Sequence, residues 1–157
     1  MNLCGDISDE LLESLKDLGA TRRSFVVGCA RPSTDAPTGK EIQWSIAAKV
    51  KEGKLDDLKA VGVEMSKTAS TDPGMHLYEW YIGGADSDTL VIMERYASSA
   101  AVMAHMGLGE PFMERFMACI EPGEIMPCGA PDEAVLEAFK SFGGKKAARV
   151  AGFIRAA

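Results

Sequence analysis

Two histidines, His76 and His105, are the side chains of this sequence that ordinarily change charge near neutral pH. His105 falls near the end of a predicted helix, where its imidazole could serve as a general base or proton shuttle for a bound substrate. The same position also suits a structural histidine that hydrogen-bonds the last carbonyls of the helix. Because the negative end of a helix favours the imidazolium, we expect this position to raise the pKa of His105. His76 follows a Pro-Gly turn and is expected to be a loop residue.

Aromatic and acidic residues lie on two neighbouring predicted strands. Alternate residues of a strand point to opposite faces, so we expect Tyr78 and Trp80 to share one face. Glu94 and Tyr96 should share another. The rings could stack on and hydrogen-bond an aromatic ligand, or they could simply form sheet core. Because a buried carboxylate must be paired or protonated, we expect Glu94 to be a structural polar residue, with a partner elsewhere in the fold or across a dimer interface.

Methionine and phenylalanine side chains cluster around His105 and in the segment after it. Flexible thioethers and aromatic rings can line an adaptable pocket for a flat apolar ligand, although core packing would produce the same pattern. Gly107 and Gly109 interrupt the cluster, which makes it a candidate pocket wall or lid. Its members are Met103, Met106, Phe112, Met113, Phe116 and Met117.

The elements that must position these residues can be read from the hydrophobic pattern. Alternation of apolar and polar residues predicts strands, and apolar residues at helical spacing predict helices. We expect a strand over 42–50, a helix that starts near Leu55 and ends before Ser70, strands over 75–82 and 89–96, a helix capped by Ser98 and ended by Gly107, a short helix from Pro111, and a strand over 124–128. This order is the ferredoxin-like α+β arrangement, an antiparallel sheet with helices on one face.

Two further segments flank this core of residues 42–128. Residues 1–41 are predicted to form an N-terminal arm that is too small to fold alone. Residues 129–157 are predicted to complete the same domain as the core. The additional elements that we expect are a helix capped by Ser8, a strand over 24–30, a Pro- and Gly-rich loop after it, a helix over 132–142 and an edge strand over 151–154.

The predicted strand over 89–96 indicates how copies of the chain could assemble. Residues Leu90 to Met93 are apolar at every position, whereas a strand with one face in water should alternate. Because helices cover only one face in this topology, the other face needs cover of its own. We expect a second copy of the chain to provide it, which gives a two-fold symmetric homodimer. The alternative is that the N-terminal arm folds over the open face.

Composition narrows the class of partner and the compartment. The 157 residues carry 17 basic and 23 acidic side chains, and the net charge of −6 makes nucleic acid and anionic membranes poor partners. No apolar run approaches the roughly 20 residues of a membrane helix, and no secretory signal is visible at the N-terminus. The four cysteines have neither zinc-site nor Cys-x-x-Cys spacing. We therefore expect a cytoplasmic protein with reduced thiols and no metal centre.

Three groups of short motifs occur in a characteristic order along the core. They are Lys49-Val50-Lys51 with Gly53-Lys54, Asp72-Pro73-Gly74 followed by Tyr78, and Glu94-Arg95-Tyr96 with Ala101 and His105. In this order and spacing they resemble the antibiotic biosynthesis monooxygenase (ABM) family. The resemblance implies a dimeric α/β barrel, and the family includes quinol and polyketide monooxygenases that use no cofactor. Haem-degrading relatives carry a haem-ligating histidine and an asparagine where this chain has Phe116 and Ile46, which disfavours haem degradation.

The resemblance implies a particular chemistry. An electron-rich, deprotonated substrate passes electrons to dioxygen, and the protein supplies an apolar pocket, a base and donors for the developing oxyanion. We therefore predict a monooxygenase without cofactor that oxidises a small quinol-like or polyphenolic aromatic substrate. The predicted base is His105, and the predicted substrate-binding residues are Tyr78, Trp80, Tyr96, Met103, Met106, Phe112 and Phe116. Two alternatives stay open: a non-enzymatic protein that binds small molecules in the same pocket, and a role in which the arm docks another protein.

Overall fold

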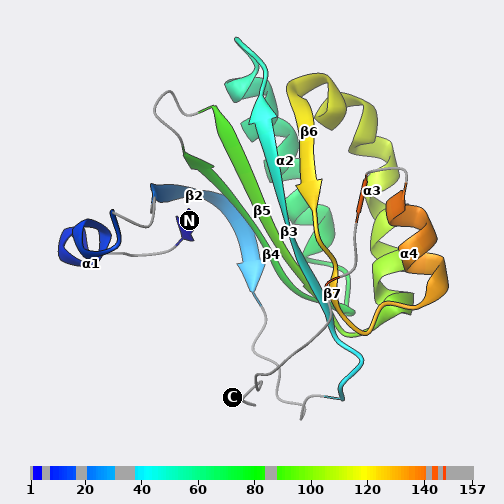
Figure 1. Ribbon diagram of the computed structural model, residues 1–157. Coiled ribbons are helices and arrows are strands. Elements are labelled where there is room, and N and C mark those ends of the chain that lie inside the picture. The colour runs from blue at the N-terminus through cyan, green and yellow to red at the C-terminus, as the bar shows by residue number, and fades with distance from the viewer. Residues whose placement is uncertain are drawn as a thin grey trace.

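The alternating apolar strands of the sequence assemble into one sheet (Figure 1). The computed structural model describes residues 2–4, 8–16, 21–30, 38–83, 88–140, 143–144 and 147. Within these residues the sheet has seven strands in the order β1-β2-β4-β5-β3-β6, and β7 also pairs with β3. The strands are β1 (Asn2–Cys4), β2 (Thr21–Ala30), β3 (Ile42–Val50), β4 (Met75–Gly83), β5 (Thr89–Tyr96), β6 (Ile120–Ile125) and β7 (Cys128–Gly129). The helices are α1 (Asp9–Ser14), α2 (Leu55–Ala69), α3 (Ser99–Cys119) and α4 (Glu133–Lys140).

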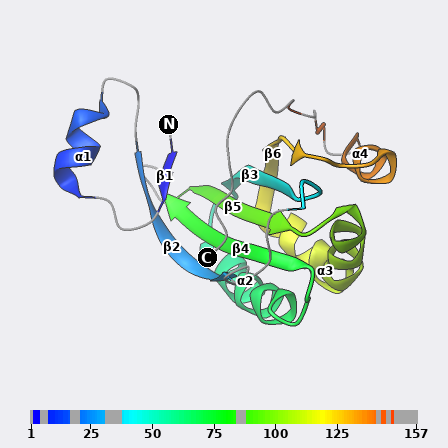
Figure 2. The ribbon, with the colours of Figure 1, turned by 90° about the horizontal axis from the view of Figure 1, so that it is seen from below.

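The chain from β3 to β6 forms the predicted ferredoxin-like unit. β3 lies between β5 and β6, and β4 pairs with β5, all in antiparallel orientation. α2 and α3 cover the same face of the sheet (Figure 2). On β5, Leu90, Ile92 and Tyr96 point into this layer, and none is more than 1% exposed. Leu58 and Val61 of α2 are buried to the same degree. The α+β class with helices on one face is confirmed.

α3 is a single helix of 21 residues, although the sequence predicts a break at Gly107. Ser98 caps it as expected, because its side chain accepts a hydrogen bond from the Ala101 N–H at 3.3 Å. The helix then continues through Gly107, Gly109 and Pro111, so the prediction of a separate short helix is wrong. Pro111 cannot donate to the Gly107 carbonyl, but Gly107 is exposed and that carbonyl is open to water. Burial of apolar side chains beyond the proline stabilises the second half of the helix.

The predicted strand over 124–128 is instead two strands, and the first of them, β6, starts directly after α3. Only the end residues of β6, Ile120 and Ile125, are buried, and a proline and a glycine lie between them. The strand therefore shows no alternation from which its start could be predicted. A Cβ on Gly123 would stand 2.0 Å from the Ala47 carbonyl oxygen, so glycine permits the close approach of β6 to β3.

The N-terminal arm joins the sheet through β2, which pairs antiparallel with β4. β2 starts at Thr21, three residues before the predicted strand over 24–30. Ser8 lies before α1 as predicted, and its hydroxyl accepts a hydrogen bond from the Leu11 N–H at 3.2 Å. α1 stands away from the sheet in both views (Figures 1 and 2). Residues 31–37 of the predicted loop and the expected edge strand over 151–154 lie outside the described residues.

α4 packs at the edge of the helix layer, where the sequence predicts a helix over 132–142. Asp132 caps it by accepting a hydrogen bond from the Val135 N–H at 3.0 Å. Phe139 is buried and packs edge-on against Trp44 of β3, with ring centroids 4.8 Å apart. The last two residues of the predicted helix lie outside the described residues. Neither α4 nor any other helix in the described part of the chain is long and apolar enough to cross a membrane.

β5 is fully buried on its helix-covered face and only partly buried on the other, where Thr89, Met93 and Arg95 are half-buried. Leu90 and Ile92 face the helices, whereas Val91 faces the other way and is only 4% exposed. On that opposite face Val91 lies between Tyr81 of β4 and Ala47 of β3. Burial on both faces thus explains the apolar run as far as Val91, whereas Met93 is half-buried. Cover of the rest of this face by a second copy of the chain stays a prediction.

Replacing Gly107 with alanine tests the continuity of α3. In the interior of an exposed helix, alanine is favoured over glycine by roughly 0.5–1 kcal/mol. Gly107→Ala should therefore raise the free energy of unfolding by that amount, as measured by urea denaturation. A glycine that ended the helix in a left-handed conformation would give the opposite sign, because alanine is strained there. Loss of stability in Gly107→Ala would contradict a continuous α3.

Candidate functional site

A row of three side chains crosses the helix-covered face of the sheet. Glu94 on β5 lies directly opposite Tyr78 on β4 and Trp44 on β3. Residues directly opposite each other point to the same face, so all three share it. Trp80 and Tyr96, each two residues along its strand, lie on this face as well. The expectation that Tyr78 and Glu94 occupy different faces is wrong, because alternation within a strand does not determine the register between strands.

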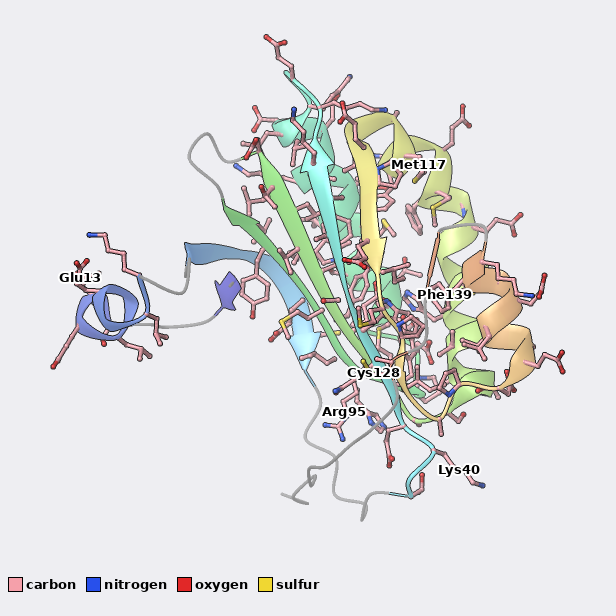
Figure 3. All side chains as sticks on the ribbon, viewed as in Figure 1. Glu13, Lys40, Arg95, Met117, Cys128 and Phe139 are labelled. Carbon is pink, nitrogen blue, oxygen red and sulfur yellow. The ribbon has the colours of Figure 1, made fainter. Side chains whose placement is uncertain are left out.

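A cavity of about 150 Å³ lies between this face and helices α3 and α4. Trp44 and Glu94 line it from the sheet, and Met117 and Phe139 line it from the helices. Figure 3 labels Met117 and Phe139, which both lie on the helix side of the sheet. Among the described residues, the ionisable side chains that line the cavity are Tyr78, Glu94 and His105. A largely apolar cavity with a few polar groups is typical of a small-molecule site.

Gly109 of α3 belongs to the wall of this cavity. It is buried, yet a Cβ added to it would meet no atom within 4 Å, because the cavity lies in front of it. Gly107 has equally open space around it, but that space is solvent. A side chain at position 109 would therefore occupy the cavity without a clash.

Glu94 is 6% exposed, and its Oε2 accepts a hydrogen bond from the Tyr96 hydroxyl at 2.5 Å. Burial raises the pKa of Glu94 to about 7, and the Tyr96 hydroxyl and the Trp44 indole oppose part of this rise. The indole Nε1 of Trp44 is itself buried without a partner in full hydrogen-bond geometry. The partner that we expected elsewhere in the fold or across an interface is thus on the same strand. A carboxyl group with a pKa near neutrality can gain and lose a proton during turnover.

His105 lies within α3, next to the aromatic row. Its ring centroid is 5.4 Å from those of Tyr78 and Tyr96. Burial lowers the pKa of His105, and the nearby Asp72 carboxylate counteracts part of this effect. The expected rise from a helix C-terminus is wrong, because α3 continues to Cys119. For the same reason His105 does not cap a helix end. Its burial favours the neutral imidazole, which can accept a proton.

Asp72 is a buried carboxylate that the sequence analysis missed. Its Oδ1 accepts a hydrogen bond from the Gly74 N–H at 2.8 Å, whereas Oδ2 lies 3.8 Å from His105 Nδ1 and has no hydrogen-bond partner. A Cβ on Gly74 would stand 2.5 Å from the Ala101 Cβ, so glycine lets this turn pack against α3. Ala101 and His105 are four residues apart on one face of the helix, so this contact brings Asp72 beside the imidazole. The Asp-Pro-Gly sequence indicates a turn but not that its carboxylate points inward.

The motifs of the sequence and this geometry agree with one known family. Residues 45–115 match the family model described as antibiotic biosynthesis monooxygenase, ABM. This part of the chain is an ABM domain. The match includes Asp72, Glu94 and His105, whereas the parts of the cavity wall on β6 and α4 lie outside it.

Solved structures share the fold of the ABM domain. MupZ from Pseudomonas fluorescens has 14% sequence identity and a TM-score of 0.66, over 74% of this chain and 95% of that one. Rv0793 from Mycobacterium tuberculosis has 20% identity and a TM-score of 0.51, over 60% and 98%. SnoaB from Streptomyces nogalater, described as a cofactor-independent oxygenase, has 12% identity and a TM-score of 0.50, over 56% and 90%. No curated protein matches the sequence.

The fold places most of the predicted binding residues in or behind the cavity. Met106 and Phe116 line it together with Tyr78. Trp80 is buried behind the cavity and packs edge-on against Phe116, with ring centroids 5.4 Å apart. Tyr96 is also buried, and it stacks on Trp44 at 4.7 Å. These two rings therefore support the lining residues from behind.

The remaining site residues show that the sequence pattern alone did not identify every side chain that lines the cavity. Phe112 lines a much smaller adjoining pocket together with His105. Met103 is 43% exposed and is not among the residues that line the cavity. Trp44 and Phe139 line the cavity but were not predicted as site residues. Each belongs to a correctly predicted element, so the missing information is which elements pack together.

The buried carboxyl group of Glu94 leads us to expect a specific pH dependence of stability. In the unfolded chain Glu94 ionises near its ordinary pKa of 4.5, and in the folded protein its pKa is about 7. Between these values the folded state binds more protons, so the free energy of unfolding falls as the pH rises, by roughly 3 kcal/mol in total. This contribution is fully present below the unfolded pKa and is lost above the folded one. Urea denaturation across this range measures the fall.

Two variants isolate the contribution of Glu94. Glu94→Gln cannot ionise, so it should lack this component of the slope while its side chain still accepts from Tyr96. Glu79→Gln is the matched control, because Glu79 also accepts a hydrogen bond from a tyrosine two residues on, Tyr81, at 2.8 Å. Glu79 is half-buried on the opposite face, and its variant should keep the wild-type slope. A wild-type slope in Glu94→Gln would contradict the burial of the Glu94 carboxyl group.

Proposed function

We propose that this protein is a monooxygenase that oxidises a small quinol-like or polyphenolic substrate with dioxygen and uses no cofactor. The observation that carries the proposal is the cavity of the ABM domain, where Glu94 and His105 face a volume otherwise lined largely by apolar side chains. The description of the family supports the oxygenase class. SnoaB, which shares the fold, is described as a cofactor-independent oxygenase.

The proposed reaction takes its electrons from the substrate. A hydroquinone that loses a phenolic proton to a base becomes an electron-rich anion, which reduces dioxygen and then combines with it at a ring carbon. The resulting hydroperoxide loses water. One oxygen atom remains on the ring, the other leaves as water, and the product is a hydroxyquinone. The ring supplies all the electrons that dioxygen takes up.

The cavity supplies groups suited to each requirement of this reaction. Its largely apolar lining suits dioxygen and an aromatic ring. The neutral imidazole of His105 and the carboxyl group of Glu94 can accept and pass on protons. Trp44 Nε1–H is a buried donor that no acceptor satisfies in full hydrogen-bond geometry, and it can stabilise an oxyanion. We propose that Tyr78 and Trp80 position the ring, with Tyr78 in direct contact and Trp80 supporting it.

Oxygen consumption with a panel of hydroquinones tests the proposed activity. The full chain should consume oxygen faster than a protein-free control. His105→Ala should slow the reaction at least about tenfold, because general base catalysis typically contributes a hundredfold or more. An absence of uptake above the control would rule out the activity on these substrates. An unchanged rate in His105→Ala would rule out the role of His105.

Two glycine variants locate the reaction in the cavity. Gly109→Phe should fill the cavity and abolish oxygen uptake. Gly107→Phe introduces the same side chain on the same helix, but into solvent, and should retain uptake. Equal activity in the two variants would place the reaction elsewhere.

The alternative function is non-enzymatic binding of a small molecule in the same cavity. The presence of Glu94 beside His105 favours catalysis over binding alone, because proton transfer then has two ionisable groups to use. Thermal stabilisation by aromatic ligands without any oxygen uptake would favour the binding protein instead.

We also propose a homodimer, which the ABM fold supports because the family resemblance implies dimeric barrels. Sedimentation equilibrium should give twice the chain mass of 16.8 kDa. A mass of 16.8 kDa would contradict the homodimer. The cytoplasm is the location that we propose, and it is supported by free thiols at Cys119 and Cys128. The net charge of −6 supports partners other than nucleic acid and membranes.

A further inference from the structure

Two polar groups face the cavity from neighbouring strands and are complementary to each other. Glu94 is an acceptor whose Oε2 is already held by the Tyr96 hydroxyl. Trp44 lies directly opposite Glu94 in the register, and its buried Nε1–H is close enough to the carboxyl group to lower the pKa of Glu94. No acceptor satisfies this N–H in full hydrogen-bond geometry, and both residues line the cavity. Because buried donors are ordinarily well paired, a donor that its neighbouring acceptor satisfies only in part indicates a ligand group that completes both.

A hydroxyl group is the ligand group that fits this pair. It donates one hydrogen bond and accepts others, so it can bind the carboxylate and the indole N–H together. A ligand carboxylate would be repelled by Glu94, and an ammonium group has no lone pair to accept from Trp44. The pair therefore selects a neutral hydroxyl over either ion.

The rest of the cavity has the size of one aromatic ring. Its volume is about 150 Å³, and an apolar protein cavity of about this size binds benzene. Phe116 and Phe139 line it and offer aromatic contacts to a bound ring. Met113 also lines the cavity and is 36% exposed, so it marks the side that faces solvent. A ligand of two or more fused rings would have to extend past Met113.

We propose that the cavity binds a single-ring phenol or hydroquinone whose hydroxyl donates to Glu94 and accepts from Trp44 Nε1–H, and that Glu94 takes the phenolic proton. This inference rests on the proposed function and specifies its substrate class and first step. The phenolic O–H bond breaks as an O–H bond forms on the Glu94 carboxylate, and no electron moves in this step. The charge left on the phenolate oxygen lies beside the Trp44 donor, which stabilises it.

Glu94 is better placed than His105 to be the first proton acceptor. It lies beside the Trp44 indole N–H of the neighbouring strand β3, whereas His105 Nδ1 is directed towards Asp72. Burial raises the pKa of Glu94 and lowers that of His105, which makes the carboxylate the base better matched to a phenol. The titratable groups around Glu94 are Tyr78 on β4, Tyr96 on its own strand and His105 on α3, and Asp72 in the turn before β4 lies next to His105. His105 then passes the proton onward.

Calorimetric titration with ligands that do not react with oxygen tests the binding geometry. Phenol donates and accepts a hydrogen bond, anisole only accepts, and toluene does neither. The wild type should bind phenol at least about tenfold more tightly than anisole or toluene, because a hydrogen bond to a charged group carries the difference. Glu94→Gln should lose this preference, and Glu79→Gln should keep it. Equal binding of the three ligands by the wild type would overturn the proposal, as would a retained preference in Glu94→Gln.

Two further measurements test the Trp44 donor and the size of the site independently. Trp44→Phe keeps an aromatic ring at this position but removes the N–H. It should weaken the binding of phenol several-fold and leave that of toluene unchanged. Unchanged phenol affinity would exclude Trp44 as the donor. Naphthol should bind more weakly than phenol, and equal or tighter binding would exclude a site for one ring.

Oxygen uptake distinguishes failure of this inference from failure of the proposed function. Hydroxyl-dependent binding that requires Glu94, without oxygen uptake from any hydroquinone, would leave the binding mode intact and refute the monooxygenase. Oxygen uptake that continues at the wild-type rate in Glu94→Gln would refute Glu94 as the proton acceptor and leave the monooxygenase intact. When both proposals hold, Glu94→Gln should lower the turnover rate at least about a hundredfold, and Glu79→Gln should leave it unchanged.

Discussion

The register between β4, β5 and β3 is the constraint on which the rest of the site depends. It places a carboxyl group between two aromatic residues, on the face that the helices cover. A slip of one residue in β5 would turn Glu94 to the opposite face and bring Arg95 into the apolar layer. Leu90 and Ile92, which are buried on the same face, hold the strand in place through apolar burial. The polar site therefore exists because its apolar neighbours fix the alignment.

Most of the fold could be predicted because its determinants are local. Strand alternation placed β3 correctly, a continuous apolar run placed β5, and Ser98 marked the start of α3. The middle of α3 could not be predicted, because glycine and proline signals there are outweighed by tertiary burial of later residues such as Phe116. The continuity of α3 affects the pKa of His105 as well as the course of the helix. His105 lies in a buried mid-helix environment that lowers its pKa, where a helix end would have raised it.

The site could be predicted only in part, because its parts meet through packing. The sequence contains the pattern Glu-x-Tyr twice, in Glu79 to Tyr81 and in Glu94 to Tyr96, and in both pairs the tyrosine donates to the glutamate. The two pairs lie on opposite faces of the sheet, and of their four side chains only that of Glu94 lines the cavity. Nothing in the local pattern distinguishes them. Asp72 was missed for a similar reason, since its position beside His105 follows from how closely the turn packs against α3.

Gly109 has a consequence for how this fold can change over evolutionary time. Substitutions in a packed wall ordinarily disturb neighbouring side chains, which restricts the variants that still fold. At position 109 a Cβ would meet no atom within 4 Å, and a side chain there would extend into the ligand cavity. Ligand size can therefore change here with little disturbance at the helix itself. A lineage, or a protein engineer, can narrow the range of accepted molecules through one helix position without first acquiring compensating changes in the core.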